Sequence, residues 1–297
     1  MENASIGVIG VTGFVGRYLA RSLAQKGYRV VGFSRAGKGT CVGVTEWRSS
    51  HVLDFSGLHG VVNLAGERID QRWTEANRVK FAESRVGITQ RIVKQLSAME
   101  LGQRPKVWIN ASAVGFYANR GDELLPESST AGAGYLADLC VDWEKSTTGA
   151  DQLGVRCVMV RIGMVLGRGG MAWDRLKRVF SLGGGARLGS GRQWMPWIHV
   201  EDLVAGIIFS VETQTLSGSI NGVAPHPERN VDFTKKLASA LRRPAIFVAP
   251  GFILRLVFGE FGDFLLGGQR CVPQRWVDAG MVFLYPRLED ALGELIG

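Results

Sequence analysis

The sequence predicts a doubly wound α/β fold, in which a parallel sheet carries helices on both faces. Three observations carry this prediction. Short apolar runs alternate with longer helical stretches over residues 1–167, a glycine-rich turn joins the first apolar run to the first helix, and the helical stretches repeat apolar residues every three or four positions. Strands that alternate with helices form a parallel sheet, because each helix returns the chain to the same edge.

The first strand, helix and strand occupy residues 5–33. Residues 5–9 form a short apolar run, as expected for a parallel strand that is covered on both faces. Residues 14–26 have helical spacing and are followed by Gly27, and glycine commonly ends helices. Residues 29–33 give the second strand.

The same alternation continues to residue 162. We expect strands at 60–64, 106–111 and 155–162, and helices at 72–96 and 138–150. The helix at 72–96 is the longest, and its spacing predicts one amphipathic helix. Its apolar positions are Val79, Ala82, Val86, Val93 and Leu96.

Beyond Gly167 the pattern loosens. Glycine clusters at 183–185 and 189–191 indicate loops, 200–211 and 231–241 read as helices, and 244–250 as an extended segment. Residues 251–266 read as one amphipathic helix or two short ones. We therefore predict a main domain over 1–167, to which 197–223 return, and a smaller substrate lobe with a C-terminal module within 168–297.

Composition excludes several classes of protein. Of 297 residues, 46% are hydrophobic and 21% charged, as in an ordinary globular protein. The net charge is +8, yet no run of five Lys or Arg and no aromatic-basic RNA-binding motif occurs, so we expect no nucleic-acid partner. No apolar run reaches the roughly 18 residues of a membrane span.

Cysteines and the N-terminus bear on metals and location. Cys41, Cys140, Cys157 and Cys271 are scattered, so we expect no metal site and a reducing compartment. The chain enters its first strand almost at once and leaves no room for a targeting peptide. We expect a cytoplasmic protein; an organelle matrix or stroma is the alternative if a transit peptide was removed.

The turn between the first strand and the first helix carries the strongest functional signal. It contains Gly10, Gly13 and Gly16 in a GxxGxxG pattern that also includes Phe14 and Val15. The glycines allow a tight turn, close approach of the backbone to a pyrophosphate, and close packing of helix on strand. The helix N-terminus adds free N–H groups. We therefore predict a Rossmann-type dinucleotide site; the alternative is a glycine-rich turn that binds no ligand.

The end of the second strand predicts which dinucleotide binds. An NAD site usually has an acidic residue about 20 residues beyond the glycines, where it holds the ribose 2′-hydroxyl. This chain has Ser34 and Arg35 there, with Lys38 nearby. A guanidinium pairs bidentately with phosphate oxygens, so the cofactor is expected to be NADP. The alternative is a solvated loop arginine.

Further motifs, spread over the whole chain, carry a family resemblance. They are the glycine turn, Asn63-Leu64-Ala65-Gly66-Glu67, Arg72-Trp73, Ser84-Arg85, Ala111-Ser112-Ala113, and the segments 161–167, 189–202, 221–225 and 272–275. With these motifs the sequence resembles the extended short-chain dehydrogenase/reductases, and more narrowly their epimerase-family branch classed as family 39U. The small C-terminal module is typical of that branch.

The resemblance implies further cofactor contacts. Those on the adenosine side come from the end of the 60–64 strand, and the others from the long helix and the segment after the 155–162 strand. They are Leu64, Ala65, Gly66, Glu67, Arg85 and Val165, with Val165 near the nicotinamide. From chemistry alone, Arg85 suits a phosphate or carboxylate if its helix lines the cleft; otherwise it is an ordinary exposed charge.

The usual catalytic pair of such enzymes is missing. A tyrosine and a lysine four residues later normally act with an upstream serine, which polarises the substrate oxygen. Ser112 fits the serine. If Leu136 and Cys140 occupy the other two positions, both groups are gone; if Tyr135 aligns instead, its partner is Leu139. In either alignment no lysine activates a tyrosine, a departure that also resembles the atypical branch.

Two hypotheses about function follow. In the first, the chain is an NADP-dependent oxidoreductase or nucleotide-sugar-epimerase-like enzyme of unknown small-molecule substrate, with Ser112 and Tyr117 as catalytic candidates and Glu67 as an acid, base or ribose ligand. Against these roles, Tyr117 suits a buried aromatic and Glu67 a helix cap. In the second, the chain senses NADP(H) or docks a protein partner with little turnover. A homodimer fits either hypothesis.

Overall fold

The computed structural model describes residues 4–297, and its centre is a sheet of seven parallel strands. The strands are β1 (Ser5–Ile9), β2 (Arg29–Ser34), β3 (Val44–Ser49), β4 (Gly60–Asn63), β5 (Val107–Ala113), β7 (Arg156–Ile162) and β12 (Gly218–Gly222). They pair in the order β12-β7-β5-β4-β1-β2-β3, and every pairing is parallel. The predicted fold class is confirmed.

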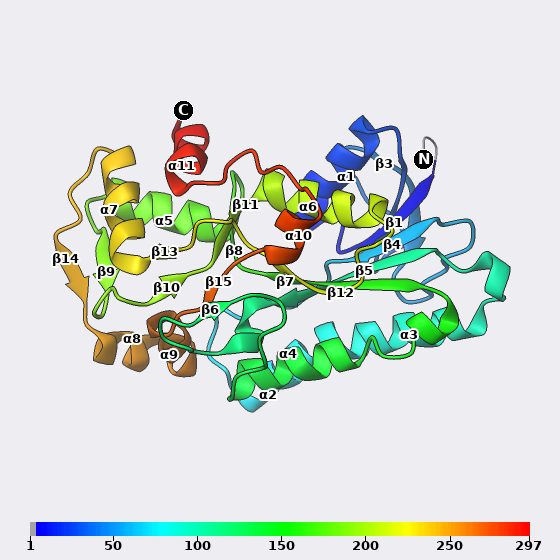
Figure 1. Cartoon of the computed structure of the whole chain (residues 1–297), viewed down its shortest axis with the longest axis horizontal. Coiled ribbons are helices and arrows are strands. Elements are labelled where there is room, and N and C mark those ends of the chain that lie inside the picture. The colour runs from blue at the N-terminus through cyan, green and yellow to red at the C-terminus, as the bar shows by residue number, and fades with distance from the viewer. Residues whose placement is uncertain (1–3) are drawn as a thin grey trace.

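Helices cover both faces of the sheet (Figure 1). On one face lie α1 (Phe14–Gln25) and α6 (Val200–Glu212); on the other lie α2 (Glu75–Ala82), α3 (Ile88–Ala98) and α4 (Tyr135–Lys145). Alternation along the strands supplies both cores. In β5, Val107 and Ile109 pack in the core with α1 and α6, whereas Trp108 packs with α3.

The segment predicted as one long helix contains a π-helical turn, Glu83–Gly87, between α2 and α3. A π-turn adds a residue and rotates the helical face. Val79 is 64% exposed and Phe81 is fully buried, so the expectation that Val79 lies on the apolar face is wrong. Leu96, beyond the turn, is buried as expected.

Two strands of the sheet, β3 and β12, were not predicted, and they lie at its two edges. β3 lies at one edge and pairs only with β2. Its sequence, VTEWRS, mixes Glu46 and Arg48 with apolar residues, and Arg48 donates to Glu46 over 2.6 Å. An edge strand that is half-buried does not need the continuous apolar run by which the central strands were recognised.

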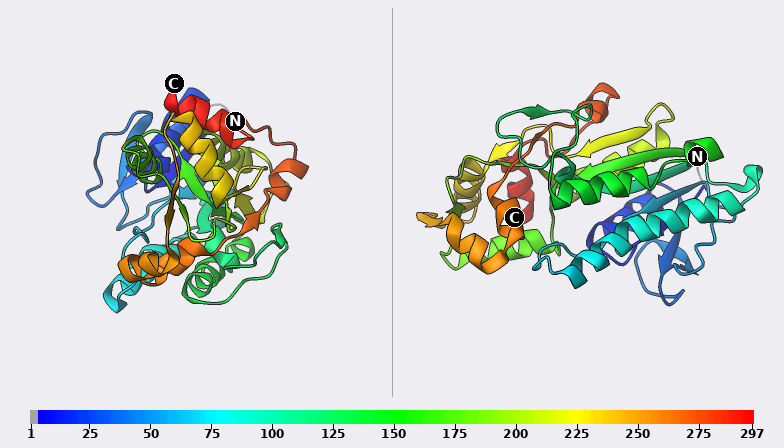
Figure 2. Two further views of the ribbon diagram at one scale, coloured as in Figure 1. Left: turned by 90° about the vertical axis from the view of Figure 1, so that its left-hand side faces the viewer. Right: turned by 90° about the horizontal axis from the view of Figure 1, so that it is seen from below.

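Most of the remaining elements form short pairings and helices beyond the carboxyl edge of the sheet (Figure 2). The strands are β6 (Leu124–Leu125), β8 (Met164–Leu166), β9 (Ala186–Leu188), β10 (Trp194–Met195), β11 (Trp197–His199), β13 (Glu228–Arg229), β14 (Phe247–Ala249) and β15 (Arg270–Cys271). The helices are α5 (Met171–Ser181), α7 (Asn230–Ala240), α8 (Gly251–Phe258), α9 (Glu260–Leu266), α10 (Gln274–Asp278) and α11 (Leu288–Ile296), with 3-10 turns at Leu101–Gln103, Val114–Tyr117 and Asp151–Leu153.

Residues 251–266 form two helices, which decides between the two predicted alternatives. Gly259 separates α8 from α9 with a φ of +62°, a left-handed value that favours glycine. Around α7 and α11 a separate apolar core contains Trp173, Trp197, Phe233 and Leu292.

Two buried side chains at the start of α6 attach the C-terminal segment. His199 caps the helix by accepting from the Glu201 N–H, and its ring lies 4.1 Å from that of Tyr285. Asp202 accepts from the backbone N–H groups of Leu284 and Tyr285, at 2.7 and 2.9 Å. Across residues 4–297, every helix is too short or too polar to traverse a bilayer.

Candidate cofactor site

The glycine turn has the geometry that a dinucleotide requires. Gly10 has a φ of +81°, and a Cβ there would lie 2.9 Å from the carbonyl carbon of Leu64. A Cβ on Gly16 would lie 2.3 Å from the Gly10 oxygen, so only glycine lets α1 pack this closely on the turn. Gly13 is exposed, which leaves its backbone open to a ligand.

The N-terminus of α1 is free to bind an anion. Gly13, the residue before the helix, has no side chain to cap it, and the first turn carries no acidic residue. The N–H groups of Phe14 and Val15 therefore lack intrahelical partners, and the helix dipole favours negative charge beside them. The Phe14 ring lies against Gly167 and Gly170, where added Cβ atoms would approach it within 2.8 and 2.6 Å.

The tip of β2 lies beside this turn. The parallel register pairs Ile9 with Phe33, so the glycine turn and Ser34 leave neighbouring strands at one edge. The Ser34 hydroxyl donates to the Lys38 carbonyl at 2.8 Å and accepts from the Lys38 N–H at 3.2 Å, which closes a tight loop. Arg35 is exposed on that loop, and no residue in 4–297 pairs with its guanidinium.

The loop after β4 forms the opposite wall. Asn63, fully buried, orders this strand end through bonds to Asn110 (2.7 Å) and to the Ala65 N–H (3.2 Å). The predicted contact residues Leu64, Ala65, Gly66 and Glu67 follow directly. The Leu64 N–H donates to the Ile9 carbonyl at 2.9 Å, and a Cβ on Gly10 would collide with the Leu64 backbone, so the glycine turn and this loop lie side by side.

Arg85 binds the backbone of the loop after β4. It lies in the π-helical turn, donates to the Glu67 carbonyl at 2.8 Å and lies 5.3 Å from the centre of the Trp143 ring. Its neighbour Ser84 accepts from the Glu67 N–H at 2.9 Å. Burial lowers the pKa of Arg85. Arg85 is thus not an ordinary exposed charge, because its guanidinium binds the Glu67 carbonyl and lies near the Trp143 ring. Its role as a direct cofactor ligand stays a prediction.

Val165 lies on β8, opposite Ile198 of β11. It packs against the core that contains Val11. The segment after β7 adjoins the glycine turn, because Gly167 lies against the Phe14 ring. Its predicted place near the nicotinamide stays a prediction.

Ser112, near the end of β5, belongs to a buried polar network. Its hydroxyl donates to Glu144 at 2.7 Å, and Glu144 accepts two further bonds from Arg161, each of 2.8 Å. The guanidinium lies 3.5 Å over the Phe116 ring and donates to the Tyr117 hydroxyl at 2.8 Å. The two catalytic candidates are therefore brought together, but through a buried ion pair.

Tyr117 is completely buried. Its hydroxyl donates to the Asn221 side-chain oxygen at 2.8 Å, and burial raises the pKa of Tyr117 to about 12. Asn221 in turn binds the carbonyls of Leu125 and Val272, so the network reaches the C-terminal module. A hydroxyl with these partners suits a structural link better than proton donation, although its catalytic role stays a prediction.

The first turns of α4 bear on which residues occupy the usual tyrosine and lysine positions. Leu136 and Cys140 both face Gly115, where an added Cβ would meet them at 3.5 and 3.7 Å. Tyr135 turns away, with its ring 5.4 Å from Trp73 and under the Arg78 guanidinium at 4.0 Å. Burial raises the pKa of Cys140 to about 12. This geometry favours the alignment of Leu136 and Cys140 with the usual tyrosine and lysine positions, and that alignment stays a prediction.

Two features of the described structure were not predicted from the sequence. Glu144 gave no signal, because a glutamate near a helix end is common. Arg17 and Arg21 of α1 line a cavity of about 280 Å³, together with Tyr18, Cys41 and Val42. The spacing of the two arginines, one helical turn apart just after the glycines, was the signal that could have found them.

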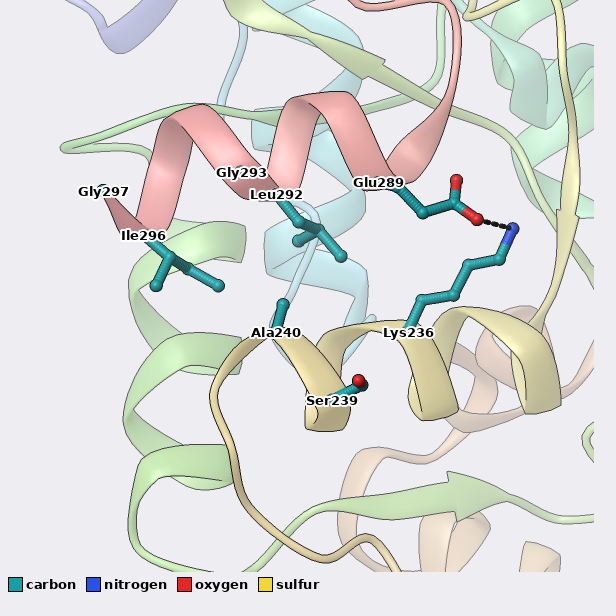
Figure 3. A pocket seen from close by; sticks show the side chains of 8 residues that line it. All are labelled: Lys236, Ser239, Ala240, Glu289, Leu292, Gly293, Ile296 and Gly297. Carbon is teal, nitrogen blue, oxygen red and sulfur yellow. Dashed lines mark ion pairs between the residues drawn. The ribbon is translucent and has the colours of Figure 1, made fainter.

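Another cavity, of about 350 Å³, lies between α7 and α11 (Figure 3). Lys236 and Glu289 form an ion pair of 2.9 Å across its rim. None of its lining residues belongs to the glycine turn, the β2 tip or the loop after β4. Within residues 4–297, no group of His, Cys, Asp and Glu has the arrangement of a metal site.

Comparison with known proteins gives this site its context. The family model described as NAD dependent epimerase/dehydratase family matches residues 6–221, and a domain of unknown function matches 249–295. An epimerase family protein of Mycobacterium bovis is 38% identical over 298 residues, covering 99% of this chain and 98% of that protein. The mouse epimerase family protein SDR39U1 is 35% identical over 295 residues, covering 97% and 98%.

A solved structure agrees over the same length. The crystal structure of human epimerase family protein SDR39U1 with NADPH superposes with a TM-score of 0.89 at 31% identity, covering 98% of this chain and 99% of that one. The family match spans more than half of the chain. It includes β1 and β2, after which the glycine turn and the Arg35 loop follow. This chain belongs to the NAD dependent epimerase/dehydratase family, among the SDR39U1-like epimerase family proteins.

Proposed function

We propose that this chain binds NADP(H) at the carboxyl edge of its central sheet. The residues present fit that cofactor, because the glycine turn leaves room that a Cβ would fill and α1 offers uncapped N–H groups. The observation that carries the choice of NADP is Arg35, exposed at the tip of β2 and free of any partner within residues 4–297. The structure of the human relative with NADPH supports the same choice.

Each predicted contact residue has a place in this proposal. The turn at Gly10, Gly13, Phe14, Val15 and Gly16 would hold the pyrophosphate, and Ser34 with Arg35 the 2′-phosphate. The adenosine side would lie along Leu64, Ala65, Gly66 and Glu67, positioned by Arg85, and the nicotinamide end near Val165. When bound, NADP(H) supplies a hydride acceptor or donor. The substrate lobe would be residues 168–297 apart from 197–223.

Titration of NADPH and NADH, followed by nucleotide fluorescence, tests the proposal. Losing a charged hydrogen bond costs about 1.5–3 kcal/mol, so Arg35→Ala should weaken NADPH binding about 10- to 100-fold. NADH has no 2′-phosphate, and its binding should be unchanged. The matched control is Arg91→Ala, because Arg91 is also an exposed arginine but lies on α3. Equal losses of both nucleotides in Arg35→Ala, or no binding in the parent, would refute the proposal.

A second candidate, an NADP(H)-binding protein with little turnover, is favoured by the contacts of Ser112. Its hydroxyl proton is directed at Glu144, and no lysine follows a tyrosine at the α4 positions. An oxidoreductase in which Ser112 and Tyr117 act would oxidise NADPH with some carbonyl compound. A screen of aldehydes, ketones and nucleotide sugars separates the two candidates: turnover that Ser112→Ala abolishes supports the enzyme, and tight NADPH binding without turnover supports the other.

A further inference from the structure

The far end of the C-terminal lobe presents a surface of large apolar side chains. Eight of them, in β14, α8 and the residue preceding β14, are 37–77% exposed: Ile246, Phe247, Val248, Phe252, Ile253, Leu256, Val257 and Phe258. We call these eight residues the apolar cap. Contiguous apolar patches of this kind are uncommon on monomeric proteins and mark interaction surfaces.

The local structure explains why the cap faces outward. In α8, Phe252, Ile253, Leu256 and Val257 recur at helical spacing on one side, while Leu254 is buried against α9 on the other. β14 pairs with β9 alone in the described chain, so it is an edge strand. Figures 1 and 2 place both elements at the end of the molecule opposite the N-terminus.

Unpaired charge beside the cap is positive. Residues 241–258 contain three arginines and no acidic residue. Arg242 and Arg243 are exposed, and no residue in 4–297 forms an ion pair with either. Arg187 lies opposite Val248 across the β9–β14 pair.

The nearest acidic residues in the sequence are already paired. Glu260 binds Arg78 at 2.5 Å, and Asp263 binds Arg255 at 2.6 Å. Arg242 and Arg243 therefore leave an excess of positive charge beside the apolar cap, in keeping with the chain's net charge of +8.

We infer that the apolar cap attaches this protein to the surface of an anionic lipid bilayer. Apolar side chains on a short helix enter the boundary between headgroups and acyl chains, while flanking arginines bind anionic headgroups. A second copy fits less well. A symmetric contact would set the unpaired arginines of one cap against those of the other, with no acidic residue between them. The attachment is peripheral, without a spanning helix, and does not depend on the cofactor.

Vesicle flotation of the full chain tests this inference. At low salt we expect binding to phosphatidylcholine vesicles that contain phosphatidylglycerol to exceed binding to phosphatidylcholine alone by about tenfold or more, because each arginine near an anionic surface adds about 1 kcal/mol. Phe252→Asp with Leu256→Asp should abolish binding to both vesicles. Arg242→Gln with Arg243→Gln should remove the preference for phosphatidylglycerol.

Matched controls keep the test decisive. Leu101→Asp with Val282→Asp places two aspartates at exposed apolar positions outside the cap and should leave flotation unchanged. Far-UV circular dichroism and the melting temperature establish that each variant is folded. The inference is overturned if the parent does not float with anionic vesicles, or if the control loses binding as fully as the cap variant. A parent that instead forms a dimer, which the cap variant dissociates in size-exclusion chromatography with light scattering, would identify a second copy as the occupant.

Discussion

Arg161 and Glu144 join β7 to α4 through two parallel hydrogen bonds, Nε to Oε1 and Nη2 to Oε2, each 2.8 Å long. Their side chains are 5% and 11% exposed. The hydroxyls of Ser112 and Ser219 donate to the remaining carboxylate lone pairs, at 2.7 and 3.0 Å. The ion pair and the two serines thus link three strands of the sheet, β5, β7 and β12, to α4.

Removal of one partner should destabilise the protein strongly. Glu144→Ala leaves a guanidinium buried without its counter-charge, and we expect the free energy of unfolding to fall by about 3–5 kcal/mol in urea denaturation. Glu144→Leu with Arg161→Met removes both charges and should cost less than the single change. Lys26→Ala breaks the exposed Lys26–Glu212 pair and serves as the control, with an expected loss below about 1 kcal/mol. A Glu144→Ala loss as small as that of Lys26→Ala would contradict the prediction.

Gly16→Ala should reduce both stability and nucleotide binding. The new Cβ would lie 2.3 Å from the Gly10 oxygen, a backbone atom that moves only if the turn opens. Overpacking typically costs about 1–3 kcal/mol, and the displaced turn loses its fit to a pyrophosphate. Gly102→Ala, where nothing lies within 4 Å of the new Cβ, should change neither property. Thermal melting and NADPH titration measure the two effects; normal binding by Gly16→Ala would argue against the proposed site.

In the folded protein, Cys41 should react with a thiol reagent far faster than the other cysteines. Burial raises the pKa of all four thiols, and that of Cys140 and of Cys157 to about 12, but Cys41 is partly exposed whereas the other three side chains are buried. Dithionitrobenzoate should therefore label about one thiol quickly and the rest on denaturation. Cys41→Ser should remove the fast phase. Fast labelling of Cys140 would contradict the prediction.

His199 should make the protein less stable in mild acid. Burial lowers the pKa of His199, although Glu294 at 3.2 Å opposes the shift. The unfolded chain, with an ordinary pKa of about 6.5, then binds a proton that the folded protein does not, so stability falls as pH drops through that value. The slope from one histidine is at most about 1.4 kcal/mol per pH unit.

The variant His199→Asn isolates this contribution. Between about pH 7.5 and pH 5.5, the parent should lose more unfolding free energy than the variant, because the other titrating groups, including His59, are common to both. Chemical denaturation at each pH gives the difference. Equal losses in parent and variant would mean that burial does not shift His199 as described.

Much of the fold was predictable because its signals are local. A buried parallel strand needs an apolar run, and a tight turn with a φ of +81° at Gly10 needs glycine, so both leave a direct trace in the sequence. The β2 tip with Arg35 was found for the same reason. The edge strands β3 and β12 were missed because their sequences, VTEWRS and GSING, contain no continuous apolar run. The rotated face at Val79 was missed because a π-turn does not follow the regular helical period.

The sequence by itself determined the alternation of the five central strands with helices, the glycine turn and the absence of a lysine four residues after a tyrosine at the start of α4. Only the tertiary structure decided that Ser112 donates to Glu144, that Tyr117 is saturated by Arg161 and Asn221, and that Arg85 holds the loop at Glu67. These partners lie 18 to 104 positions apart along the chain. Hydrogen bonds between such distant side chains depend on how the sheet and helices pack, and no local pattern of residues encodes that packing.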